Sequence, residues 1–264
     1  MQSIPQVKPV KQAFDLSNRV ALVTGGNGGI GLSIALGLQS AGARVVIAAR
    51  DARKAETALS RLAHDGHDAI FLKADVSDPA ECIRLVQETV KAAGGIDILV
   101  NNAGVTARRQ PQDLTLEEWE RVLRVNLTSA FLLSQAAHKF MSGRRKGKII
   151  NMGSMMSIFG APFAAAYAAS KGGLVQLTKS LATAWAADGI QVNAILPGWI
   201  DTEMGASARA QVTGLNERVL ARTPANRWGN GDDLQGAAVF LASDASDFVT
   251  GVALPVDGGY SISG

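Results

Sequence analysis

Seven apolar segments rich in valine and isoleucine alternate with helical patterns along almost the whole chain. The segments are residues 19–24, 44–49, 68–74, 96–104, 147–154, 190–198 and 252–256. The clearest helical patterns are 29–42, 51–65, 79–93, 115–141 and 163–187, the fourth opening with a capping-box pattern from Thr115 to Glu118. Strands that are apolar without interruption are buried on both faces, which is typical of a parallel sheet covered by helices. Because crossovers are right-handed, the pattern predicts an α/β fold: a doubly wound, Rossmann-type, seven-stranded parallel sheet with helices on both faces.

The chain length fits a single domain. Its 264 residues suit one large α/β domain better than two small ones, and no linker or low-complexity segment divides them. We expect a flexible lead-in at 1–14, followed by one domain at 15–264. Such a sheet places ligands at the carboxyl ends of its strands, so the loops after Thr24, Val100, Met152 and Leu196 must gather at one site.

The composition narrows the possible partners and the location. The formal charge is only +3, and the one basic cluster, residues 143–148, is short enough to be a solvated turn, so no nucleic-acid partner is expected. The sequence contains no run of 18 apolar residues, so no membrane span is predicted. The first 18 residues lack the apolar region of a signal peptide. The single cysteine, Cys82, excludes an internal disulfide, and together these features predict a cytoplasmic protein.

A glycine-rich loop, TGGNGGIG at residues 24–31, joins the first predicted strand to the first helix. It contains the spacing G-x-G-x-x-G at Gly26, Gly28 and Gly31. Glycines at this place permit a tight turn and let backbone N–H groups approach a pyrophosphate at the helix N-terminus. The loop lacks the Lys-Ser/Thr ending of a P-loop, so it predicts dinucleotide binding; the alternative is a flexible loop without a ligand.

Arg50 follows the second predicted strand, where the adenosine ribose of a dinucleotide is expected. An acidic residue at this place pairs with a ribose 2′-hydroxyl, whereas an arginine suits a 2′-phosphate. The residue therefore favours NADP over NAD, with NAD still possible. In the alternative interpretation, Arg50 only begins a polar helix with Asp51 and Arg53.

Tyr167 and Lys171 are separated by four positions in the predicted helix 163–187. Residues at this spacing share one face of a helix, about 6 Å apart. A cation near a phenol favours the phenolate, and a phenol whose pKa is lowered from about 10 is a usable general acid or base. The pair alone is also compatible with a surface helix that carries one aromatic residue and one solvated lysine.

Taken together, these pieces resemble the short-chain dehydrogenase/reductase family over residues 14–262. Thr24, Gly25, Gly29, Ile30 and Gly31 match its T-G-x-x-x-G-I-G motif, and residues 101–104 match its NNAG motif. The positions that match its S…Y-x-x-x-K signature are Ser154, Tyr167 and Lys171. Residues 197–198 with Thr202 match the element that follows the sixth strand. One departure is Gly28, where some NADP-preferring members carry a basic residue.

The resemblance implies roles for particular residues. The catalytic set is Asn126, Ser154, Tyr167 and Lys171, in which Tyr167 exchanges a proton with the substrate, Ser154 binds the carbonyl oxygen, and Asn126 holds a water of a proton relay. The residues expected at the cofactor are Gly25, Asn27, Gly29, Ile30, Gly31, Arg50, Asp75, Val76, Asn101, Asn102, Ala103, Gly104, Tyr167, Lys171, Pro197, Gly198, Ile200 and Thr202. Lys171 is expected to lower the pKa of Tyr167 and to hold the nicotinamide ribose.

Within the family, residues 223–229 and 240–251 look most like bacterial sugar-acid and polyol dehydrogenases of the gluconate and deoxygluconate type. The implied activity is an NAD(P)-dependent interconversion of a secondary alcohol and a ketone on a small molecule. A 3-oxoacyl-carrier-protein reductase or a general carbonyl reductase shares nearly all these motifs. A non-catalytic, NAD(P)-binding regulatory protein is a further alternative, against which the intact catalytic set argues.

Weaker features concern the substrate, metals and assembly. Residues 199–226 are poorly patterned and are predicted to form a mobile lid, with Ser154, Met155, Trp199 and Met204 as walls of the substrate pocket; plain packing is the alternative for the last three. His64 and His67 lie on a predicted polar turn, so no metal site is expected. A homotetramer is predicted from the family resemblance and from surface left over on two helices: apolar residues on helix 115–141, namely Phe131, Leu132, Ala136 and Phe140, and small residues such as Ala169 on helix 163–187.

Overall fold

The computed structural model describes residues 9–63 and 69–263. Three parts of the predictions lie outside these residues: the lead-in up to residue 8, the junction at 64–68 between the second predicted helix and the third strand, and the histidines of that turn. The described part of the lead-in contains a short helix, α1 (Val10–Ala13), which the sequence patterns do not predict.

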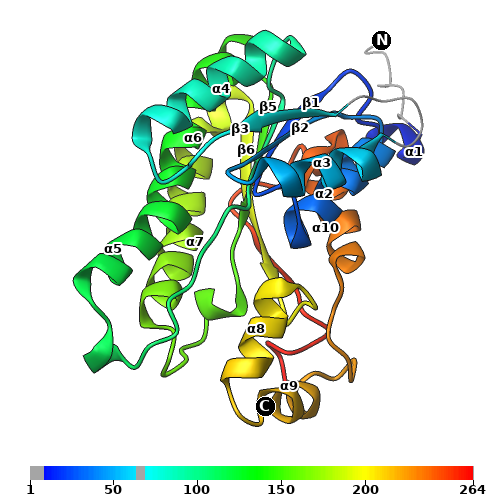
Figure 1. The fold of residues 1–264 in the computed structure, drawn as a ribbon. Helices are drawn as coiled ribbons and strands as arrows, with labels where there is room; N and C mark the ends of the chain where they lie inside the picture. The colour runs from blue at the N-terminus through cyan, green and yellow to red at the C-terminus, as the bar shows by residue number, and fades with distance from the viewer. Residues whose placement is uncertain (1–8, 64–68, 264) are drawn as a thin grey trace.

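Seven parallel strands form one sheet, as predicted (Figure 1). They are β1 (Val20–Thr24), β2 (Arg44–Ala49), β3 (Ile70–Lys73), β4 (Ile98–Asn101), β5 (Gly147–Met152), β6 (Ile190–Pro197) and β7 (Ala253–Val256). Their order across the sheet is β3-β2-β1-β4-β5-β6-β7. The order reverses direction between β1 and β4, which pair so that Val23 lies opposite Val100. The loops after β1 and β4 therefore leave the sheet side by side, at the place where a doubly wound fold binds its ligand.

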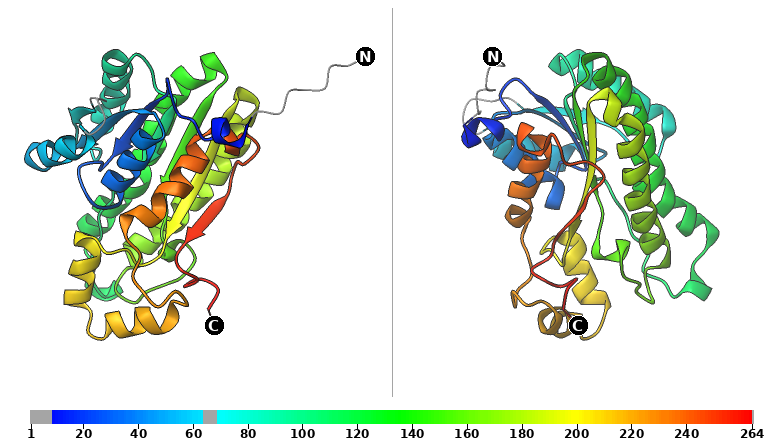
Figure 2. Two further views of the ribbon diagram at one scale, coloured as in Figure 1. Left: turned by 90° about the vertical axis from the view of Figure 1, so that its right-hand side faces the viewer. Right: turned by 180° about the vertical axis from the view of Figure 1, so that it is seen from behind.

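Helices cover both faces of the sheet, as Figure 2 shows. On one face lie α2 (Gly29–Ser40), α3 (Ala52–Leu62) and α10 (Gln235–Ala242); on the other lie α4 (Pro79–Ala93), α5 (Leu116–Leu123), α6 (Ser129–Met141) and α7 (Ala165–Trp185). Each face has its own apolar core, one centred on α2 and α10 and the other on α4, α6 and α7. The chain is thus a single Rossmann-type domain, in which α10 is a helix that the sequence patterns do not predict.

Local capping fixes where several helices begin. The Asp51 carboxylate accepts from the Lys54 backbone N–H at 3.1 Å and starts α3 directly after β2. The capping box predicted from Thr115 and Glu118 is confirmed at the start of α5. The long predicted helix 115–141 is continuous but not uniform, because a π-helical turn, Arg124–Thr128, joins α5 to α6. Such turns insert one residue into a helix and often lie at functional sites. Within the described residues, no helix has both the length and the apolar character to cross a bilayer.

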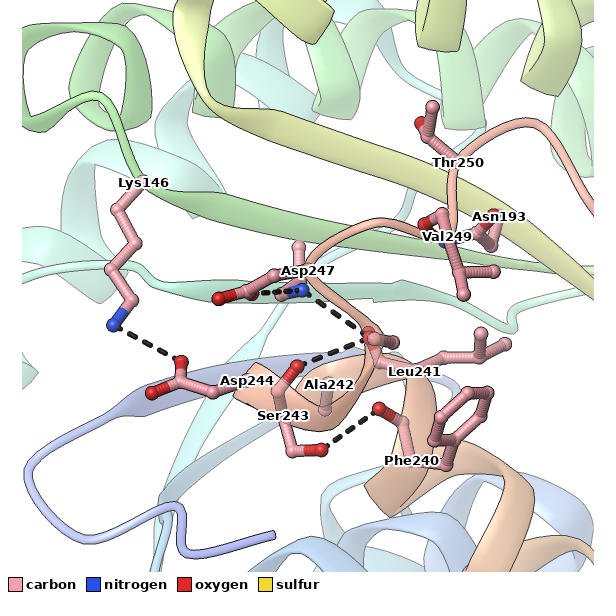
Figure 3. Close-up of polar contacts among 12 residues, drawn as sticks. Lys146, Asn193, Phe240, Leu241, Ala242, Ser243, Asp244, Asp247, Val249 and Thr250 are labelled. Carbon is pink, nitrogen blue, oxygen red and sulfur yellow. Dashed lines mark hydrogen bonds and ion pairs between the residues drawn. The ribbon is translucent and has the colours of Figure 1, made fainter. Parts of the chain in front are cut away.

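Ion pairs at the amino ends of β1 and β5 connect the sheet to the segment that follows α10; Figure 3 shows one of them, between Lys146 and Asp244. Asp244 forms an ion pair with Arg19, which precedes β1. It forms a second ion pair, at 3.2 Å, with Lys146, which precedes β5. Lys148 of β5 is only 1% exposed, and its ammonium contacts Asp247 at 2.8 Å. A buried ammonium needs such a partner, because burial disfavours its charge. These contacts fix the segment after α10 against the sheet.

Candidate active site

Loops from four strands converge at the carboxyl edge of the sheet and enclose two adjoining cavities. The larger is a groove of about 420 Å³ that runs from the end of β2, over the glycine loop, to Tyr167 and Lys171. The smaller is a pocket of about 150 Å³ beyond Tyr167, under α8 (Glu203–Gln211). α8 and α9 (Leu215–Arg222) lie below this edge in Figure 1. They form the predicted lid segment; its mobility remains a prediction.

The glycine loop has the shape that a dinucleotide requires. A Cβ on Gly31 would lie 2.3 Å from the Gly25 carbonyl oxygen and 2.4 Å from the Asn102 side-chain nitrogen, so only glycine fits there. A Cβ on Gly28, by contrast, would meet no atom within 4 Å, because this position faces the open groove. The first turn of α2 thus presents its backbone to the groove without side chains in the way, which suits a pyrophosphate. The residues present therefore fit a dinucleotide cofactor.

Most of the residues predicted at the cofactor line this groove. They are Gly25, Asn27, Gly29, Ile30, Gly31, Arg50, Asp75, Val76, Asn102, Ala103, Gly104, Tyr167, Lys171, Pro197 and Thr202. Gly198 and Ile200 instead line the adjoining pocket. Asn101 was placed wrongly, because its side chain points into the sheet–helix layer and donates to Asn151 at 2.8 Å and Ser134 at 3.1 Å.

The adenosine end of the groove combines a carboxylate with two cations. Arg50 and Lys54 both line it, and Arg50 lies 3.8 Å from the Asp75 carboxylate. Burial works against the charge of Asp75, but hydrogen bonds from Ser77 and the charge of Arg50 outweigh it and lower the pKa of this carboxyl. Asp75 is therefore ionised at neutral pH and can accept a hydrogen bond from an adenine amine, the role predicted for it.

Tyr167 and Lys171 project from the first turns of α7 toward the junction of groove and pocket. The Lys171 ammonium lies 5.7 Å from the centre of the Tyr167 ring and donates to the Met152 carbonyl oxygen at 2.6 Å. Ser154, which follows β5, lines the same pocket as Tyr167 and lies near enough to its hydroxyl to influence its pKa. The end of β5 and the start of α7 therefore bring the serine, the phenol and the ammonium predicted as catalytic into one place.

Burial decides the protonation of this pair. It raises the pKa of Tyr167 above its ordinary value, against the opposing influence of the Ser154 hydroxyl and the Arg108 charge. It also lowers the pKa of Lys171 from 10.5 to about 8. The sequence-based expectation of a lowered tyrosine pKa was therefore wrong in direction, because helical spacing indicates proximity but not burial. A phenol that stays protonated is ready to donate a proton at neutral pH.

Asn126 lies in the π-helical turn and is buried beside the same site. A Cβ added to Gly104 would lie 3.5 Å from the Asn126 side-chain oxygen and 3.7 Å from the Lys171 nitrogen, so both side chains lie beside Gly104. The side-chain amide of Asn126 forms its hydrogen bonds within the protein. Its oxygen accepts from the Val105 N–H at 2.8 Å, and its nitrogen donates to the Val105 carbonyl at 2.9 Å and to the Ser170 hydroxyl at 3.0 Å. If Asn126 holds a relay water, its backbone carbonyl must do so.

The four residues predicted as walls of the substrate pocket all line it: Ser154, Met155, Trp199 and Met204. Sequence reasoning missed Arg108, which enters the same pocket from the loop after β4. Its guanidinium donates to the Met204 carbonyl at 3.0 Å and to the Ser207 hydroxyl at 3.2 Å, both on α8. Desolvation lowers the pKa of Arg108. Within the described part of the chain Arg108 forms no ion pair, so its positive charge in the pocket has no carboxylate partner.

A Rossmann-type sheet whose dinucleotide groove ends at a serine, a tyrosine and a lysine defines a nicotinamide-dependent oxidoreductase. Residues 25–261 match a family model described as enoyl-(acyl carrier protein) reductase, adh_short_C2. The chain belongs to the short-chain dehydrogenase/reductase family, as its motifs predict, and it is an oxidoreductase that acts on CH–OH groups.

Similar proteins of named activity cover almost the whole chain. The 2-dehydro-3-deoxy-D-gluconate 5-dehydrogenase of Bacillus subtilis (strain 168) is 45% identical over 94% of this chain and 96% of its own length. The 5-keto-D-gluconate 5-reductase of Escherichia coli (strain K12) is 41% identical over 95% of this chain and 98% of its own. A crystal structure of a gluconate 5-dehydrogenase from Burkholderia cenocepacia J2315, in complex with NADP and tartrate, has a TM-score of 0.91 and 41% identity, covering 97% of this chain and all of that one.

Proposed function

We propose that this protein is an NADP-dependent dehydrogenase of a sugar acid, which interconverts a secondary alcohol and a ketone at carbon 5 of a gluconate-like substrate. The observation that carries the proposal is Arg108, a cation with no acidic partner among the described residues, in a pocket that Met155, Trp199 and Met204 also line. A substrate carboxylate supplies the missing charge, because guanidinium and carboxylate form strong paired hydrogen bonds. Relatives named for gluconate derivatives, one of them crystallised with the hydroxy acid tartrate, point to the same class.

The arrangement of the side chains suits a ketone reduction. The nicotinamide, when bound, supplies the hydride. Tyr167 donates the proton to the carbonyl oxygen, and its phenolate takes a proton back in the oxidative direction. Ser154 donates a hydrogen bond to the same oxygen, where negative charge develops. Lys171, held by the Met152 carbonyl, stabilises the phenolate that forms.

A substrate panel tests the proposal. We expect NADPH oxidation with 5-keto-D-gluconate or 2-dehydro-3-deoxy-D-gluconate, and much weaker rates with an uncharged ketose or a 3-oxoacyl thioester. Arg108→Met should raise KM for the acids at least about tenfold, the value of one charge-assisted contact, and leave KM for the uncharged ketose unchanged. Arg109→Met is the matched control, because Arg109 points to Glu118 at 3.3 Å and does not line the pocket. A thioester preference would contradict the sugar-acid assignment.

Apolar side chains on α6 support a homotetramer. Phe131 and Phe140 are 40% and 36% exposed on its outer face. Ala136, also named for this surface, is buried in the core instead, because it faces the sheet. Ala169 of α7 is exposed and small, which permits close helix–helix approach. Light scattering should give roughly four times 27.5 kDa; a fully active monomer would contradict this assembly.

A cytoplasmic location is the last part of the proposal. It is supported by the single cysteine, Cys82, which is buried and free and whose pKa burial raises to about 11. A thiol in this state is inert and suits a reducing compartment. Cell fractionation tests the location, and recovery of the protein outside the cytoplasm would contradict it.

A further inference from the structure

Lys54 and Glu203 form an ion pair across the mouth of the cofactor groove. Lys54 lies in the first turn of α3, directly after β2, whereas Glu203 is the first residue of α8 in the lid. The ammonium binds both carboxylate oxygens, at 2.9 and 2.7 Å, and both residues line the groove. The pair therefore connects the adenosine end of the cofactor site to the lid.

The position of Lys54 is suited to a phosphate. The adenosine ribose of a dinucleotide is expected at the end of β2, next to Arg50, and Lys54 follows Arg50 by four residues and lines the same groove. The groove is open at Gly28, where a Cβ would meet nothing within 4 Å. Gly28 is the position where a basic residue is missing from the glycine loop, so Lys54, which lines the same groove from α3, can supply the second cation.

Each of these cations is already paired with a carboxylate, Arg50 with Asp75 and Lys54 with Glu203. The second pair is open to solvent, with the lysine side chain 51% and the glutamate side chain 86% exposed. Exposed ion pairs of this kind are weak, whereas a phosphate offers more charge and three acceptor oxygens. Exchange of the carboxylate for a phosphate is therefore favourable.

We propose that Lys54 is a second ligand of the 2′-phosphate of NADP and that the lid carboxylate Glu203 competes with the phosphate for it. The inference rests on the NADP dependence proposed above. It assigns cofactor specificity to two residues of the groove, Arg50 and Lys54, and it makes Glu203 a residue that weakens cofactor binding. Binding of the phosphate also frees the start of α8 from α3.

Equilibrium binding of NADPH and NADH, followed by tryptophan fluorescence, tests both parts. Lys54→Met should raise the Kd for NADPH about tenfold, the value of one charge-assisted contact, and leave the Kd for NADH within about twofold. Glu203→Gln should lower the Kd for NADPH about two- to fivefold, because it removes the competitor, and leave that for NADH unchanged. Arg53→Met is the matched control: Arg53 lies in the same turn of α3, is exposed and does not line the groove.

The outcomes separate this inference from the proposed function. A wild-type protein that binds NADPH no better than NADH overturns the NADP dependence, and the role of Lys54 with it. A wild-type preference for NADPH that Lys54→Met leaves unchanged overturns only the role of Lys54. Unchanged or weaker NADPH binding in Glu203→Gln overturns the competition, and this variant gives the answer even if Lys54→Met folds poorly. Unchanged NADH binding shows in each variant that the groove is intact.

Discussion

Replacement of Lys171 by methionine should stabilise the protein at pH 7 while it abolishes turnover. Lys171 is only 4% exposed, and burial lowers its pKa from 10.5 to about 8. A lowering of this size means that the charged form costs the folded state about 3 kcal/mol. Methionine has a similar shape and no charge, but it leaves the Met152 carbonyl without its donor, at a cost of about 1 kcal/mol. We expect a net gain of about 2 kcal/mol in the free energy of unfolding.

The gain should depend on pH in a defined direction. Below pH 8 both the folded and the unfolded wild-type chain carry the proton, so the folded state bears the whole cost. Between pH 8 and 10.5 the folded chain has released its proton and the unfolded chain has not, so wild-type stability rises with pH. At about pH 9.5 the cost has fallen to about 1 kcal/mol, and the advantage of the variant should nearly vanish.

Urea unfolding of both proteins at pH 7 and 9.5, followed by tryptophan fluorescence at one protein concentration, measures this difference. The fixed concentration matters because an oligomer unfolds at a midpoint that depends on it. Other buried groups with shifted pKa values, such as Lys148, whose pKa burial lowers, are present in both proteins and cancel. A variant less stable than the wild type at pH 7, or a difference that does not change with pH, would refute the reasoning about the buried ammonium.

Two further predictions concern charges elsewhere in the protein. Arg50→Asp should raise the Kd for NADPH much more than that for NADH, because a phosphate contact is lost and a like charge is gained; equal changes in both constants would make Arg50 a surface residue only. Asp244→Asn should lower the free energy of unfolding at pH 7 by about 2 kcal/mol: burial opposes the ionised form, but Arg19 and Lys146 hold the pKa of Asp244 at about 2 instead of 3.8. Because this acid has a lowered pKa, its contribution is present above pH 3.8 and is lost as the pH falls toward 2, so the wild type and the variant should converge there. Acid unfolding curves that stay separate would contradict this.

Most of the fold follows from sequence signals that are local and repeated. Unbroken apolar strands and capped helices predict the sheet, and the glycine loop with the Tyr167–Lys171 spacing predicts where its ligands lie. α10 was missed because residues 235–242 are apolar on all sides, QGAAVFLA, with no helical periodicity to distinguish them from a strand or a buried loop.

Asn101 was misplaced and Arg108 was missed because the sequence does not specify the direction in which these side chains point. Asn101 and Asn102 are adjacent, but Asn101 is the last residue of β4 and points toward α6, whereas Asn102 turns back and donates to the Thr24 carbonyl at 2.8 Å. Arg108 and Arg109 are also adjacent, and only packing shows that the first enters the substrate pocket. The orientation of Asn101 could have been predicted from its place in a strand, because successive side chains of a strand point to opposite faces of the sheet.

The central claim is that Tyr167 exchanges the proton of the reaction. The most direct test compares Tyr167→Phe with the wild type in two measurements, kcat with a sugar-acid ketone and the Kd for NADPH. Phenylalanine keeps the ring that lines groove and pocket and removes only the hydroxyl, so the Kd should be unchanged. We predict that kcat falls about 10²- to 10⁴-fold, the contribution of a positioned general acid. Activity within about tenfold of the wild type would contradict the assignment of Tyr167 as the acid.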